Sequence, residues 1–148
     1  METSKVTMQL LKSITLTNNV QDVPLLATFV EEVCEQAGFD ASVTMQMNLA
    51  MEEAVVNVMN YAYPSGTQGD IMIDALMGNG KLQFVISDKG TPFDPTAEAD
   101  ADTTLSAEER PIGGLGIFLV RQLMDDINYE YKDDKNILTL SKEMGSVK

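Results

Sequence analysis

The sequence predicts an α/β protein, an α+β two-layer sandwich whose mixed, mostly antiparallel sheet is covered on one face by three helices. Two observations indicate the helices: amphipathic stretches follow one another from Val23 to Pro64, and a third follows a glycine run at residues 113–116. A third observation indicates the antiparallel pairing: two apolar segments flank the turn composition at residues 78–80, as in a β-hairpin.

The chain opens with a predicted strand and a predicted helix. Residues 6–17 are rich in β-branched and apolar types, which favours a strand. The stretch from Val23 to Ala37 has helical periodicity, with Pro24 near its start, where proline is tolerated. Gly38 follows the last periodic residue, which is typical of a helix C-cap.

The next predicted helix carries the first candidate functional residues. Asp40 or Ser42 can cap it, and it stops before Pro64. Glu53 and Asn57 stand four residues apart, so they are neighbours on one helix face and can reach the same ligand, while Glu52 points away. They lie at the edge of an apolar stripe, which predicts a half-buried Glu53; the stripe comprises Val43, Met47, Ala50, Ala54, Val58 and Tyr61.

A β-hairpin is predicted between Asp70 and Asp88. Gly78-Asn79-Gly80 suits a turn with positive φ. By period-two alternation, Asp88 shares a face with the apolar residues Leu82, Phe84 and Ile86, so its carboxylate points toward the core side at the end of the strand.

The remaining residues predict a loop, a helix and a second hairpin. Residues 94–110 combine acidic groups with Pro, Ala and Thr and predict a mobile surface loop, with a short helical turn around Ser106. Gly113-Gly-Leu-Gly116 opens the third helix, and residues 127–142 form a hairpin around Lys132–Asn136.

Composition bounds the class. The 148 residues predict one domain, 1–148, and no apolar run reaches the length of a membrane span. The net charge of −13 argues against nucleic acid as a ligand. The sequence has no histidine, which excludes Ser/His/Asp triads, Cys/His pairs and phosphohistidine within this chain. The lone Cys34 predicts a buried structural thiol and a cytoplasmic location.

Three separated segments together resemble the nucleotide site of the GHKL ATPase and kinase superfamily, the histidine kinase-like ATPases. The strings at residues 93–95 and 113–124 are similar to its anti-sigma factor serine/threonine kinase branch. The matching residues are Glu53, Asn57 and Tyr61 in the N-box, Asp88, Gly90 and Pro92 in the first glycine box, and Gly114 and Gly116 in the second.

The resemblance implies a role for each motif. Asp88 would accept a hydrogen bond from the amine of adenine, with Gly90 and Pro92 in the adjoining loop. Asn57 would bind Mg²⁺ together with ATP phosphates, and Glu53 would act as general base. The family commonly has a Gly-Thr pair entering the last strand, with the threonine near the adenine; this chain departs from that pattern with Lys135-Asn136, so the resemblance does not carry this contact over.

The phosphates of ATP are assigned to the third segment. A glycine run that precedes a helix offers unpaired backbone amides, so Gly114 and Gly116 predict a phosphate site. The resemblance places Arg110 on the lid, where it would reach the terminal phosphate. The alternative is an exposed Arg110 that pairs with Glu108 or Glu109.

The implied function is an ATP- and magnesium-dependent anti-sigma factor kinase with a mobile lid, which phosphorylates an anti-sigma factor antagonist and sequesters a sigma factor by exclusive binding. The resemblance suggests a homodimer, and we expect no membrane or nucleic-acid partner. Two alternatives remain: an ATP-binding regulatory module without transfer activity, and a GHKL ATPase or histidine-kinase catalytic domain that acts in trans.

Overall fold

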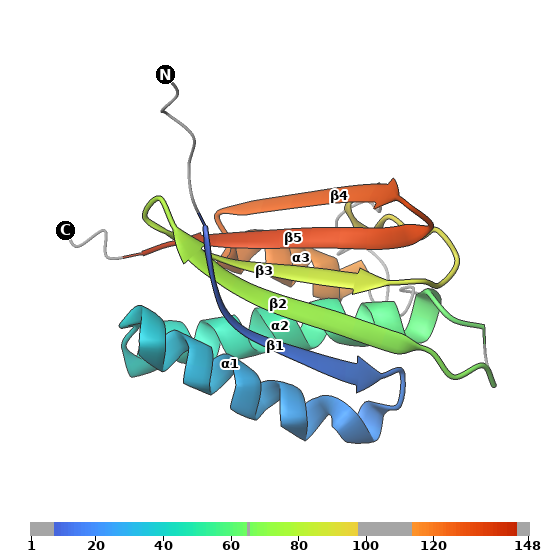
Figure 1. Ribbon diagram of the computed structural model, residues 1–148, viewed down its shortest axis with the longest axis horizontal. Coiled ribbons are helices and arrows are strands. Elements are labelled where there is room, and N and C mark those ends of the chain that lie inside the picture. The colour runs from blue at the N-terminus through green and yellow to red at the C-terminus, as the bar shows by residue number, and fades with distance from the viewer. Residues whose placement is uncertain (1–7, 65, 98–113, 145–148) are drawn as a thin grey trace.

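The computed structural model describes residues 8–64, 66–97 and 114–144 (Figure 1). Its five strands form one sheet in the order β1-β2-β3-β5-β4. Every pairing between the described strands is antiparallel, so the expected mixed, mostly antiparallel sheet is antiparallel throughout this part of the chain. The strands are β1 (Gln9–Thr17), β2 (Asp70–Gly78), β3 (Lys81–Asp88), β4 (Asp126–Lys132) and β5 (Lys135–Glu143).

Three α-helices of the described chain cover one face of the sheet, which confirms the predicted two-layer architecture (Figure 1). Helix α2 packs against both of its helical neighbours and so lies between them. This position explains why its buried surface is wider than the predicted stripe and includes Met51, Val55 and Met59. The helices are α1 (Val23–Ala37), α2 (Ala41–Tyr61) and α3 (Gly114–Leu123); short 3-10 turns occur at η1 (Val20–Asp22) and η2 (Pro95–Ala97).

Local sequence signals set the helix boundaries. Gly38 ends α1 in the left-handed region at φ 83°, where glycine has no Cβ penalty. Asp40, one of the two predicted caps, starts α2 because its carboxylate accepts a hydrogen bond of 2.9 Å from the Val43 amide. Among the described residues, no helix is both long and apolar enough to cross a bilayer.

Two tight turns fix the register of the two hairpins. Asn79 and Gly80 have φ values of 54° and 74°, and Asp133 and Asp134 have φ values of 56° and 63°. Two consecutive positive φ values are the signature of a type I′ turn, whose twist matches that of the flanking strands. Both predicted hairpins are therefore confirmed.

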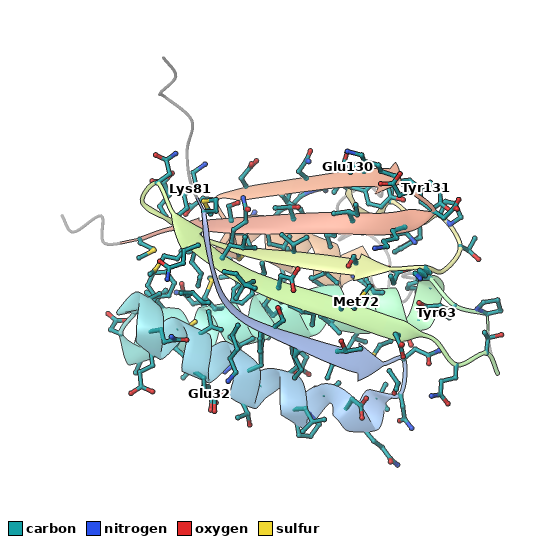
Figure 2. All side chains as sticks on the ribbon, in the orientation of Figure 1. Glu32, Tyr63, Met72, Lys81, Glu130 and Tyr131 are labelled. Carbon is teal, nitrogen blue, oxygen red and sulfur yellow. The ribbon has the colours of Figure 1, made fainter. Side chains whose placement is uncertain are left out.

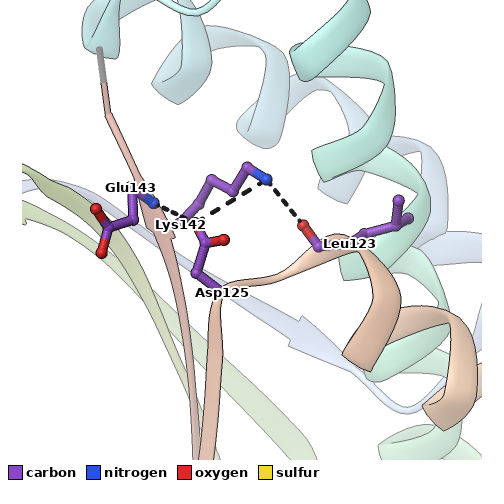
Figure 3. Close-up of polar contacts among 4 residues, drawn as sticks. All are labelled: Leu123, Asp125, Lys142 and Glu143. Atoms are coloured by element: carbon purple, nitrogen blue, oxygen red, sulfur yellow. Dashed lines mark hydrogen bonds and ion pairs between the residues drawn. The ribbon is translucent and has the colours of Figure 1, made fainter. Parts of the chain in front are cut away.

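Polar contacts tie the end of α3 to β5 (Figure 3). Lys142 donates a hydrogen bond of 3.2 Å from Nζ to the carbonyl oxygen of Leu123, the last residue of the helix. The same Nζ lies 4.0 Å from Oδ2 of Asp125, which also accepts a 2.7 Å hydrogen bond from the Glu143 amide. A cation at this end complements the helix dipole and closes the turn into β4.

Candidate functional site

Four segments that are distant in the sequence meet at one end of the molecule. The C-terminal ends of α2 and β3 lie there together with the N-terminal ends of α3 and β5 (Figure 1). The register of the sheet accounts for part of this meeting, because Asp88 at the end of β3 is paired with Asn136 near the start of β5. The candidate site is built from the side chains at this end.

Asp88 points into the core side, as its strand alternation predicted, and is 1% exposed. Its Oδ1 atom accepts hydrogen bonds from the Gly90 amide at 2.8 Å and from Nδ2 of Asn136 at 2.9 Å. No described residue donates to Oδ2. Burial raises the pKa of Asp88 above its ordinary value, and the two hydrogen bonds offset only part of that rise.

Helix α2 buries the carboxamide of Asn57, which is 4% exposed. No described residue forms a hydrogen bond with this side chain, although a buried carboxamide normally has a partner. Glu53, one turn earlier, is half-buried, while Glu52 is exposed, as the helix pattern predicted. Burial, and secondarily the neighbouring charge of Glu52, raise the pKa of Glu53.

The loop after β3 is pressed against the end of α2. The Thr91 amide donates a 2.6 Å hydrogen bond to the carbonyl oxygen of Ala62. A Cβ atom added to Gly90 would lie 2.2 Å from that same oxygen, so only glycine fits. The close backbone approach at Gly90 is therefore to the end of helix α2. Pro92, the third residue of this motif, is exposed.

Two tyrosines hold the surroundings of this loop. Tyr63 lies just beyond α2 (Figure 2). Its hydroxyl donates a hydrogen bond of 2.7 Å to the Asp70 carbonyl oxygen and accepts one of 3.1 Å from the Lys89 amide. Tyr61 was expected on the apolar stripe, but its side chain is 38% exposed, and the prediction that it belongs to the buried stripe was wrong. Its ring instead stacks on the ring of Phe93, which follows β3, with a centroid separation of 5.2 Å.

Sequence reasoning missed the central role of Asn136. It is 4% exposed and contacts Asp88, the loop after β3 and Tyr129. One signal was available: Asn136 precedes Leu138 and Leu140 at a spacing of two, and both leucines are buried. A polar residue that occupies one of these alternate, inward-facing positions of β5 is expected to be buried, as Asp88 is on β3.

The third predicted segment is described only in part. Helix α3 begins at Gly114, as predicted, and Gly116 lies in its first turn. Arg110 and the turn around Ser106 lie outside the described residues. On the described part of α3, the Nη2 atom of Arg121 donates a 2.5 Å hydrogen bond to the Thr96 carbonyl oxygen, which links α3 to η2. The described residues contain no cluster of three or more His, Cys, Asp or Glu side chains that could hold a metal ion.

An antiparallel sheet with helices on one face defines a two-layer α+β protein, and buried polar side chains gather at one end of its sheet. Comparison with known proteins assigns the particular family. Residues 16–142 match the histidine kinase-like ATPase domain, and the chain belongs to that family. The resemblance inferred from the three motifs is thereby confirmed.

Two relatives with names of protein kinases place the chain near one branch of the family. It is 31% identical to the serine-protein kinase RsbW of Listeria monocytogenes over 110 residues, which cover 72% of this chain and 70% of the relative. It is 25% identical to the serine/threonine-protein kinase BtrW of Bordetella bronchiseptica over 113 residues, covering 76% of this chain and 80% of that protein.

A solved structure supports the fold. The crystal structure of the RsbU and RsbW domains of a Mycobacterium tuberculosis protein matches with a TM-score of 0.62 and 14% identity. The match covers 90% of this chain and 33% of that longer chain.

Proposed function

We propose that this chain is an ATP-dependent protein serine/threonine kinase that uses magnesium. Two buried polar groups carry the proposal: the Asn57 carboxamide and the Oδ2 atom of Asp88, neither of which has a hydrogen-bond partner among the described residues. Leaving such groups unpaired costs about 1–3 kcal/mol each. A ligand with a donor for one and a cation for the other would relieve both costs, and Mg-ATP carries both.

The residues present fit that ligand. The Oδ2 atom of Asp88 would accept a hydrogen bond from the exocyclic amine of adenine, beside the loop of Gly90 and Pro92. The carboxamide oxygen of Asn57 would hold Mg²⁺, which prefers oxygen ligands and shares its shell with phosphates and water. When bound, the ion would neutralise phosphate charge.

The phosphate end of the ligand is assigned to α3 and the lid. The first amides of α3, around Gly114 and Gly116, point out of a helix N-terminus, which favours anions. Arg110 completes the proposal as the lid cation that reaches the terminal phosphate.

Glu53 is proposed as the general base. Its carboxylate would accept the proton of the attacking hydroxyl as that oxygen bonds to the terminal phosphorus, and the bond to the leaving diphosphate oxygen would break. Because burial raises the pKa of Glu53, its carboxylate is a stronger base than an exposed glutamate. Because Glu53 lies one turn from Asn57, it would stand near a magnesium ion held by Asn57 without serving as a tight ligand.

The relatives suggest the partners. Because they are named as serine and serine/threonine protein kinases, we propose that the substrate is a serine or threonine of an anti-sigma factor antagonist, and that this chain also holds a sigma factor. Unphosphorylated antagonist would displace the sigma factor, and phosphorylation would release the antagonist. A single domain, 1–148, a homodimer and a cytoplasmic location complete the proposal.

Two measurements test it. Mg-ATP at one hundred times its dissociation constant should stabilise the chain by about 2.7 kcal/mol. Labelled ATP should then transfer phosphate to a small antagonist-type protein encoded beside this gene. Glu53→Gln should keep Mg-ATP binding and lose transfer by at least about a hundredfold, whereas Glu52→Gln, the exposed neighbour, should retain both. Transfer that survives Glu53→Gln would remove the base assignment; stabilisation without transfer in the wild-type chain would favour a regulatory module.

A further inference from the structure

The side-chain amide of Asn136 uses its whole hydrogen-bonding capacity within the protein. Its Nδ2 atom donates to Oδ1 of Asp88 and to the Thr91 carbonyl oxygen, both at 2.9 Å. Its Oδ1 atom accepts from the Phe93 amide at 2.9 Å and from the Tyr129 hydroxyl. A carboxamide has two N–H donors and two acceptor lone pairs, so these four bonds saturate it.

This saturation determines what Asn136 can do for a ligand. Its side chain has no donor or acceptor left for a nucleotide, so it does not form a hydrogen bond with a base. It contacts instead the groups that line the proposed nucleotide site, Asp88 and the loop after β3. One bond holds Oδ1 of Asp88, and two bonds hold the loop at Thr91 and Phe93, on either side of Pro92.

The bond to Asp88 also fixes which carboxylate oxygen remains available. Oδ1 receives both the Gly90 amide and Nδ2 of Asn136, so rotation of the carboxylate would break two hydrogen bonds at once. Oδ2 therefore stays in one place as an acceptor without a described donor. A base with an amine can donate a hydrogen bond to this fixed, buried acceptor. A base with a keto group would instead place its oxygen opposite the carboxylate oxygen, which is unfavourable because two acceptors repel each other.

We propose that Asn136 is a positioning residue that makes the site selective for a purine with an exocyclic amine, by holding Asp88 and the loop at residues 91–93. This inference rests on the proposed nucleotide site. It assigns selectivity to a residue that never touches the base. The ligand class is an adenine nucleotide, discriminated from the corresponding hypoxanthine nucleotide, which carries a keto group in place of the amine.

The test measures the affinities of ATP and ITP by titration calorimetry in the presence of Mg²⁺. We expect the wild-type chain to prefer ATP by about tenfold to hundredfold, the value of one hydrogen bond to a charged group. Asn136→Ser, which removes the amide, should reduce that preference by about tenfold, mostly through ATP. In an Asp88→Asn background, Asn136→Ser should leave the ratio of the two affinities unchanged, because its effect passes through the Asp88 carboxylate.

If Asn136→Ser weakened the binding of ATP and ITP equally, Asn136 would have a structural role alone and the proposal would be overturned. The proposal would also be overturned if Asn136→Ser still changed the ratio of the two affinities in the Asp88→Asn background. Tyr129→Phe provides a milder probe if Asn136→Ser does not fold, because it removes only the hydroxyl donor to Asn136. It should lower the ATP preference by about twofold to fivefold, and an unchanged preference would contradict the proposal.

The matched control is Tyr131→Phe. Tyr131 lies on β4, as Tyr129 does (Figure 2). Its side chain is 44% exposed, and no described residue forms a hydrogen bond with its hydroxyl. Its variant should keep both affinities. A wild-type chain that binds neither nucleotide would refute the proposed function itself, and this result is distinct from ATP binding whose selectivity does not depend on Asn136.

Discussion

Replacing Asn57 with leucine should make the nucleotide-free protein more stable and its binding of Mg-ATP weaker. The carboxamide is 4% exposed and has no described partner, so its burial costs about 1–3 kcal/mol. Leucine is apolar and of similar size, and its different branching costs less than about 1.5 kcal/mol. The net expectation is a gain of about 1 kcal/mol in the free energy of unfolding, measured by urea denaturation without nucleotide.

The same variant should lose most of the stabilisation that Mg-ATP gives the wild-type chain, because leucine offers no oxygen to the ion. Asn60→Leu is the control: Asn60 lies three residues later on α2 and is exposed, so its variant should change stability by less than about 0.5 kcal/mol and keep the response to Mg-ATP. A loss of more than 1 kcal/mol in nucleotide-free Asn57→Leu would refute the reasoning, since it would mean that the carboxamide is satisfied within the protein.

Three further predictions concern stability and reactivity. Gly90→Ala should lower the free energy of unfolding by about 2–4 kcal/mol, because its Cβ would overlap the Ala62 backbone and break the hydrogen bond made there; a loss below 0.5 kcal/mol in urea denaturation would contradict this packing. Burial raises the pKa of Asp88 in the folded protein, so folding favours the protonated carboxyl. The resulting contribution to the free energy of unfolding is complete below about pH 4 and is lost as the pH rises through the raised pKa. Asp88→Asn should therefore gain stability relative to wild type as the pH rises above about 4 in urea titrations, and a constant difference would count against a buried carboxylate. Burial raises the pKa of the Cys34 thiol to about 11, so a thiol reagent at pH 8 should label it only as fast as the protein opens, and immediate labelling of the native chain would show that it is accessible.

Local chemistry made much of the fold predictable. The hairpin turn at Asn79 and Gly80, the Asp40 cap and the left-handed Gly38 depend on residues a few positions apart, and each was found as expected. The placement of Glu53 at the edge of the α2 core follows from the helical period in the same way. Tyr61 was misplaced because the helical period alone does not show that its ring turns outward and stacks on Phe93, a residue that follows β3.

The sequence by itself determined the three motifs, their order, the half-buried state of Glu53 and the inward direction of Asp88, because periodicity along one element decides which way a side chain points. It placed Asn57 only at the edge of the apolar stripe, and the structure buries it. Only the tertiary structure decided that Asn136 binds Asp88, 48 positions earlier, and that Gly90 is required by a helix end. Both contacts arise when separate elements pack, and their geometry depends on strand register and helix position, which no local pattern specifies.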